Sequence, residues 1–153
     1  MVAIQITNEY GLVLLSAAST FFVSAWLGMR VGSFRKAAKI PYPYEYASYE
    51  QVSTASPATS KAMHQFNCAQ RGHQNFNENH VPALGAMLIT GLVYPRTAAA
   101  LGAVWSVNRV LYAVGYTNGK EGGRGRYLGA AGILALYVLI GYSGWTAWKI
   151  SSA

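Results

Sequence analysis

Residues 10–29, YGLVLLSAASTFFVSAWLGM, contain no charged side chain. As a helix that rises 1.5 Å per residue, this stretch is about 30 Å long, which matches the hydrocarbon core of a bilayer. Residues 127–148, YLGAAGILALYVLIGYSGWTAW, form a second run without charge. Because soluble helices keep a charged face, the two runs favour membrane-spanning helices over the alternative, a soluble four-helix bundle.

Two further stretches have helical character but contain charged residues. Residues 63–93 are polar in their first half and apolar in their second, and residues 98–116 form an apolar run interrupted by Asn108 and Arg109. Between them, Tyr94-Pro95-Arg96 predicts a tight turn. The sequence therefore predicts one all-α domain over residues 1–153, an integral membrane four-helix bundle with spans at about 10–29, 63–93, 98–116 and 127–148.

The connections between these spans are polar. Prolines at 41, 43 and 57 predict a loop over residues 30–61, and TNGKEGGRG at 117–125 predicts a glycine-rich loop. The first span is expected to be retained, because no Lys or Arg precedes it as in a cleavable signal peptide.

The distribution of Lys and Arg predicts the orientation in the membrane. Eight of them follow the first and third spans, whereas only Arg96 and Lys149 lie on the opposite side. The eight are Arg30, Arg35, Lys36, Lys39, Lys61, Lys120, Arg124 and Arg126. By the positive-inside rule, the basic loops are cytosolic and both termini face the other side.

Composition excludes several classes of function. Charged residues make up 11% of the chain and the net charge is +7, which is too sparse for a nucleic-acid-binding face. All five acidic residues are glutamates, so mechanisms that need aspartate are excluded. The single cysteine, Cys68, excludes an intrachain disulfide and a CxxC zinc site.

Charged and polar residues within the predicted second and third spans are the main functional signal. At helical spacing, two sets each share one helix face: Arg71, Asn75 and Glu78, and Arg109, Tyr112 and Tyr116. A charge at mid-bilayer costs about 2.5–3.5 kcal/mol on insertion scales, so such residues usually have partners or line a cavity. One interpretation is a structural ion-pair network near the cytosolic interface.

The other interpretation is a binding site. Arg71 and Arg109 outnumber the single carboxylate of Glu78, which leaves a positive surplus suited to an anionic ligand. If the ligand also has an ammonium group, the carboxylate can accept it, and a small zwitterionic peptide has this charge pattern.

Three other interpretations have less support. His64, His73 and His80 could suggest a metal or haem, but a metal site needs three or four ligands with settled geometry, so no metal is expected. Residues 117–125 lack the GxxxxGK[ST] pattern of a phosphate loop. A transporter or channel would extend a charged face into the first or fourth span, and neither span has one.

Two motifs resemble those of a known family. FNCAQRGHQNFNE at 66–78, followed by Pro82, and NRVLYAVGY at 108–116 are similar to the second- and third-helix motifs of the MAPEG family of glutathione-dependent membrane proteins. The basic loop and the YPxxY loop resemble the type-3 microsomal glutathione S-transferases most closely. The resemblance implies a four-helix homotrimer that binds glutathione between neighbouring subunits near the cytosolic side.

The resemblance also implies roles for individual residues. The thiolate-stabilising arginine would be Arg124, with Arg126 as the alternative. Asn79 stands where several relatives have tyrosine. The implied glutathione-binding residues are Arg35, Arg71, His73, Asn75, Glu78, Arg109, Tyr112 and Tyr116.

The implied activity is a membrane glutathione S-transferase that is also a lipid hydroperoxide peroxidase. Glutathione is the cosubstrate, lipophilic electrophiles or lipid hydroperoxides are the second substrates, and conjugation like that of a leukotriene C4 synthase is a further reaction. The alternative is a non-enzymatic lipid-binding or scaffold relative. The expected location is the endoplasmic reticulum, with the nuclear envelope and outer mitochondrial membrane as alternatives.

Overall fold

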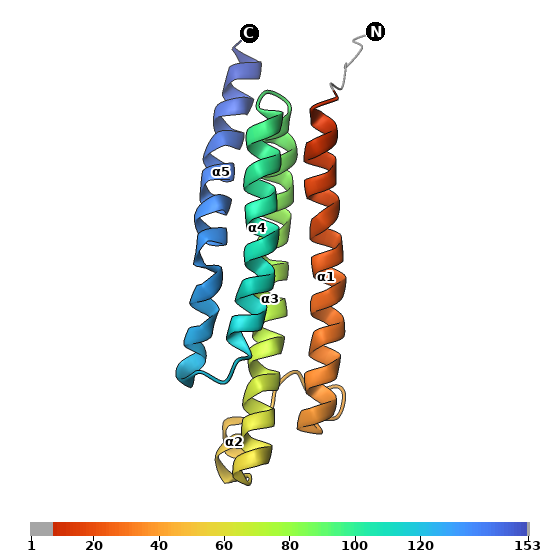
Figure 1. The fold of residues 1–153 in the computed structure, drawn as a ribbon, viewed down its shortest axis with the longest axis vertical. Coiled ribbons are helices and arrows are strands. Elements are labelled where there is room, and N and C mark those ends of the chain that lie inside the picture. The colour runs from red at the N-terminus through yellow and green to blue at the C-terminus, as the bar shows by residue number, and fades with distance from the viewer. Residues whose placement is uncertain (1–7, 153) are drawn as a thin grey trace.

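The computed structural model describes residues 8–152, and this part of the chain is helical without strands (Figure 1). Four long helices form the body, and a short helix and a 3-10 helix lie in the connections. The elements are α1 (Tyr10–Ala38), α2 (Tyr49–Thr54), α3 (Pro57–Gly91), α4 (Pro95–Tyr116), η1 (Glu121–Gly129) and α5 (Ala130–Ser151).

The long helices run up and down in chain order and form one bundle (Figure 1). Helix α1 packs on α3 and α4, and α5 packs on the same two helices from another side. The described ends of the chain lie together at one end of the bundle, whereas α2 and η1 lie toward the other (Figure 1). The all-α prediction is confirmed, and the basic connections share one end of the bundle.

Within the part of the chain that the structure describes, three helical stretches are long and apolar enough to cross a membrane, namely α1, α4 and residues 122–151. Helix α3 is long enough but not apolar enough to be among them, because its first half is polar. At 1.5 Å per residue its 35 residues extend over about 52 Å, well beyond a hydrocarbon core of about 30 Å. The polar turns of α3 therefore extend past the bundle beside α2 (Figure 1).

The first connection is shorter than predicted. The sequence predicts a loop from residue 30, but α1 continues to Ala38 and ends where Lys39 adopts a left-handed φ of 55°. Arg35 and Lys36 in the last turn favour this extension, because cations stabilise the C-terminal end of a helix. The predicted loop also contains α2, which begins with a capping box between Ser48 and Gln51.

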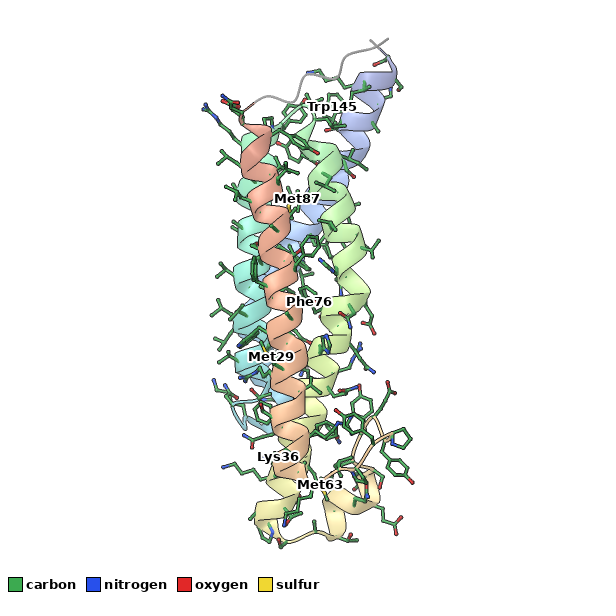
Figure 2. All side chains as sticks on the ribbon, turned by 90° about the vertical axis from the view of Figure 1, so that its right-hand side faces the viewer. Met29, Lys36, Met63, Phe76, Met87 and Trp145 are labelled. Atoms are coloured by element: carbon green, nitrogen blue, oxygen red, sulfur yellow. The ribbon has the colours of Figure 1, made fainter. Side chains whose placement is uncertain are left out.

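The interior is apolar, and so is much of the outside. Phe76 and Met87 are buried along the axis of the bundle (Figure 2), together with Trp105. On the outside, Leu15, Phe22 and Leu134 are 70%, 77% and 67% exposed. Exposed apolar surface of this extent indicates a lipid environment.

Close backbone contact holds η1 against the end of α4. A Cβ atom at Gly115 would lie 2.1 Å from the carbonyl oxygen of Gly125. The reverse is also true, because a Cβ atom at Gly125 would lie 1.9 Å from the oxygen of Gly115. Only glycine permits this approach, so this glycine pair sets the position of the basic loop.

We expect Gly115→Ala to destabilise the protein by about 1–3 kcal/mol, because the added methyl group must push η1 away from α4. The measurement is the thermal unfolding midpoint of the detergent-purified protein. Gly144→Ala on α5 is the matched control, since a Cβ atom there would meet nothing within 4 Å. Equal midpoints for both variants would contradict the assigned contact.

Candidate functional site

An ion pair lies on the outer face of α3. Both terminal nitrogens of the Arg71 guanidinium, Nη1 and Nη2, donate to the Glu78 carboxylate, at 2.7 and 3.2 Å. The two side chains are 43% and 54% exposed, so the pair is open at the surface of this single chain. Spacing of seven residues, two helical turns, puts them on one face as predicted.

Arg109 occupies a different environment, because it is only 3% exposed. Its Nη1 donates to the Asn75 side-chain oxygen at 3.0 Å, and its Nη2 donates to the Gly129 carbonyl at 3.4 Å. Its Nε has no hydrogen-bond partner among the described residues. This guanidinium joins α3, α4 and η1 through neutral acceptors, so its positive charge is not neutralised by these partners.

Two tyrosines and Arg126 extend this cluster toward the basic loop. The rings of Tyr112 and Tyr116 meet edge to face at 5.5 Å, and Arg109 lies 4.9 Å from the Tyr112 ring. From η1, the Arg126 guanidinium lies 5.5 Å from the Tyr116 ring centre. Asn75, Arg109, Tyr112, Tyr116 and Arg126 thus form one continuous group that α3, α4 and η1 contribute.

The conformation of η1 explains the position of Arg126. Gly122 and Gly123 have φ angles of 59° and 64°, and their carbonyls accept from Arg126 Nη1 at 2.9 and 3.0 Å. The Arg124 side chain is exposed. Of the two arginines proposed from the sequence, Arg126 is the one that contacts the tyrosine cluster.

Two of the residues proposed from the sequence lie apart from the cluster. His73 faces α1, since its ring lies 3.8 Å from where a Cβ atom at Gly28 would be. Arg35 is 8% exposed and points into the first connection, where it donates to the Tyr44 carbonyl at 2.6 Å. In this chain neither side chain reaches the face that contains Arg71 and Glu78.

The first connection adds polar residues that the sequence did not single out. The Tyr46 hydroxyl donates to the Gln74 side-chain oxygen, and the Gln74 amide donates to Glu45 at 3.3 Å. Gln74 stands between Arg71 and Glu78 on the same face of α3, at i+3 from the arginine. That helical spacing could have identified Gln74 from the sequence. The contacts of Glu45 and Tyr46 could not be predicted in this way, because they depend on how the loop folds.

Tyr46 remains a hydrogen-bond donor at neutral pH. Burial raises the pKa of its phenol above the ordinary value, and the nearby Arg71 partly offsets this rise. Since an unperturbed tyrosine has a pKa of about 10, the group is protonated throughout the physiological range.

His80 and Asn79 have local partners on α1, α3 and α4. His80 Nε2 lies 2.8 Å from the Thr20 hydroxyl, and its ring packs on Phe76 and Trp105. Asn79 donates to the Asn75 carbonyl at 2.7 Å. Within residues 8–152, no three His, Cys or Glu side chains lie close enough together to hold a metal ion.

Among the surface grooves outside the charged cluster, two lie along the long helices. One, of about 410 Å³, is at the end of the bundle where Trp145 lies (Figure 2), and aromatic residues typical of a membrane interface line it. The other, of about 280 Å³, is an apolar groove between α1 and α4. It is lined by Ser19, Val23, Ala103, Ser106, Val107 and Val110.

Comparison with known families gives one match over most of the chain. The model of the MAPEG family matches residues 13–145, which span the bundle from the first turns of α1 to the last turns of α5. The charged face of α3, the tyrosines of α4 and the arginines of η1 all lie within the matched residues.

Proposed function

The chain belongs to the MAPEG family, which includes glutathione transferases and peroxidases as well as other members, and we propose that it is a membrane glutathione transferase with lipid hydroperoxide peroxidase activity. Its family and its three long apolar helices make it an integral membrane protein. The observation that supports the activity best is the continuous group of Arg109, Asn75, Tyr112, Tyr116 and Arg126 beside the Arg71–Glu78 pair.

Electrostatics supports glutathione as the ligand. Glutathione has two carboxylates and one ammonium group, so it needs more cations than anions in its site. Arg109 is buried with neutral hydrogen-bond partners, and Arg126 lies at the tyrosine cluster. Buried cations without a counter-ion attract anions strongly, because little water remains to screen the charge.

Arginine would also activate the thiol of glutathione. A free thiol has a pKa of about 8.5 and is mostly protonated at pH 7, whereas the thiolate is the nucleophile. An adjacent guanidinium favours the anion and keeps its own proton. Lowering the thiol pKa by two units needs about 2.7 kcal/mol, which one or two arginines can provide. The contact with Tyr116 favours Arg126 over Arg124 for this role.

The thiolate would react in two ways. In conjugation its sulfur bonds to an electrophilic carbon. The electron pair of the bond that breaks leaves with the displaced group or, in an epoxide, stays on the ring oxygen, which then takes a proton. In peroxide reduction the sulfur takes the terminal oxygen of a lipid hydroperoxide, the O–O bond breaks, and the lipid leaves as an alcohol after protonation. A second glutathione then forms the disulfide and releases water. Neither reaction requires a protein nucleophile.

The apolar groove between α1 and α4 supports a lipophilic second substrate. It opens on the outside of the bundle, and four of its six lining residues are apolar. A substrate dissolved in the bilayer would reach this surface without crossing water. The endoplasmic reticulum is the membrane we propose, with the basic loops in the cytosol.

Exposure of the ion pair supports assembly with a neighbouring subunit, and the family resemblance is what makes the proposed assembly a homotrimer. Glu78 stands 13 residues before the end of α3, about 20 Å from it, and therefore lies within a hydrocarbon core of about 30 Å that begins there. An open ion pair at that depth is unfavourable against lipid. A neighbouring subunit would cover it and would complete the glutathione site.

The first test is turnover of glutathione by detergent-purified protein, with a lipid hydroperoxide and with a model aryl halide. We expect both reactions, because both use the same thiolate. Glutathione binding without turnover of either substrate would favour the scaffold alternative. Absence of binding would contradict the proposed function itself.

The second test compares Arg126→Ala with Arg124→Ala. We expect Arg126→Ala to reduce the bound thiolate by about tenfold or more, equivalent to one pKa unit, and to change glutathione affinity less. The ultraviolet absorbance of the thiolate measures the first quantity, and equilibrium binding measures the second. If Arg124→Ala abolishes the thiolate and Arg126→Ala does not, Arg124 has the role instead.

The third test concerns assembly. We expect native mass spectrometry of the detergent-solubilised protein to give three times the mass of the 16.5 kDa chain. Glu78→Gln is expected to keep the trimer and to weaken glutathione binding. A monomer that still turns over glutathione would show that no neighbouring subunit is needed.

A further inference from the structure

The connection between α1 and α2 is fixed against the bundle by side chains on both sides. Arg35 donates to the Tyr44 carbonyl, and its guanidinium is held between the rings of Tyr42 and Phe66, at 4.4 and 4.7 Å from their centres. On α3, the Asn67 side chain bonds both the N–H and the carbonyl of Ala47, each at 2.9 Å. Residues 44–47 therefore have a defined path along α3.

This path ends at the charged face of α3. Tyr46 donates to Gln74, and the same Gln74 donates to Glu45, so two consecutive loop residues bind one helix residue. Gln74 is one turn from both Arg71 and Glu78. The loop thus brings a second carboxylate, Glu45, to the face where the sequence shows only one.

The two carboxylates differ in what they already bind. Both oxygens of Glu78 accept hydrogen bonds from Arg71. Glu45 is exposed, and its one side-chain hydrogen bond among the described residues comes from a neutral amide at 3.3 Å. A carboxylate has about four acceptor positions, so Glu45 can accept an ammonium group without breaking an ion pair.

We propose that the loop at residues 44–47 forms one wall of the glutathione site and that Glu45 binds the ammonium group of the γ-glutamyl end, while Tyr46 and Gln74 hold the loop in place. The inference rests on the proposed function, since it names the residue that recognises one end of the same ligand. Arg35 then has a positioning role, because its hydrogen bond to the Tyr44 carbonyl holds the loop that contains Glu45. Selectivity for a peptide with a free ammonium group then comes from the loop.

The test compares glutathione with deaminated glutathione, the same peptide without its ammonium group, in equilibrium binding to detergent-purified full-length protein. We expect Glu45→Gln to weaken glutathione binding by about tenfold, as for loss of one charge-assisted hydrogen bond. Binding of the deaminated peptide is expected to change less than twofold. The substituted amide retains an oxygen acceptor for Gln74, so the loop contact survives.

Glu50→Gln is the matched control, because it removes the same charge from the exposed face of α2 within the same connection. We expect it to leave binding of both peptides unchanged, and the thermal unfolding midpoint of each variant reports the fold. Equal weakening of both peptides by Glu45→Gln, or no weakening of either, would overturn the assignment of the ammonium group. If the wild-type protein binds no glutathione, the proposed function fails and the assignment fails with it.

Discussion

The buried guanidinium of Arg109 is the interaction on which the arrangement of the site depends. It bonds Asn75 on α3 and the carbonyl of Gly129 at the end of η1, and it lies on α4 itself. A charge with so little access to water needs partners at defined positions, so the three elements cannot shift independently. Because its partners are neutral, the same residue that orders the site also leaves it positive.

The two connections at the basic end add residues to the site that the long helices form. Contact between Gly115 and Gly125 sets η1 against α4 and brings Arg126 to Tyr116. On the other side, Asn67 and Arg35 hold the first connection along α3. The connections therefore bring further polar side chains to the charged residues that α3 and α4 already contain.

Much of this site could be predicted from helical periodicity. Arg71, Asn75 and Glu78 share a face because spacings of four and seven residues do so on every α-helix. The same rule joins Arg109 to Tyr112 and Tyr116. Periodicity could not show that Arg109 points inward to Asn75 while Arg71 pairs with Glu78 on the surface, since the direction of each face depends on the neighbouring helix. His73 and Arg35 were assigned to the site by the resemblance and not by periodicity, and within this chain both lie apart from the tyrosine cluster.

By itself the sequence determined the class of protein, because helices of about twenty residues without a charge are typical of membrane spans. Its two long motifs also indicated the family, which the comparison confirmed. It also determined that cations exceed anions among the residues within the helices. Only the tertiary structure decided which charged side chain meets which partner, in particular Arg126 at Tyr116 and Glu45 at Gln74. The physical reason is that glycine-rich and proline-rich connections have no periodicity, so their side chains are positioned by the surfaces against which they pack.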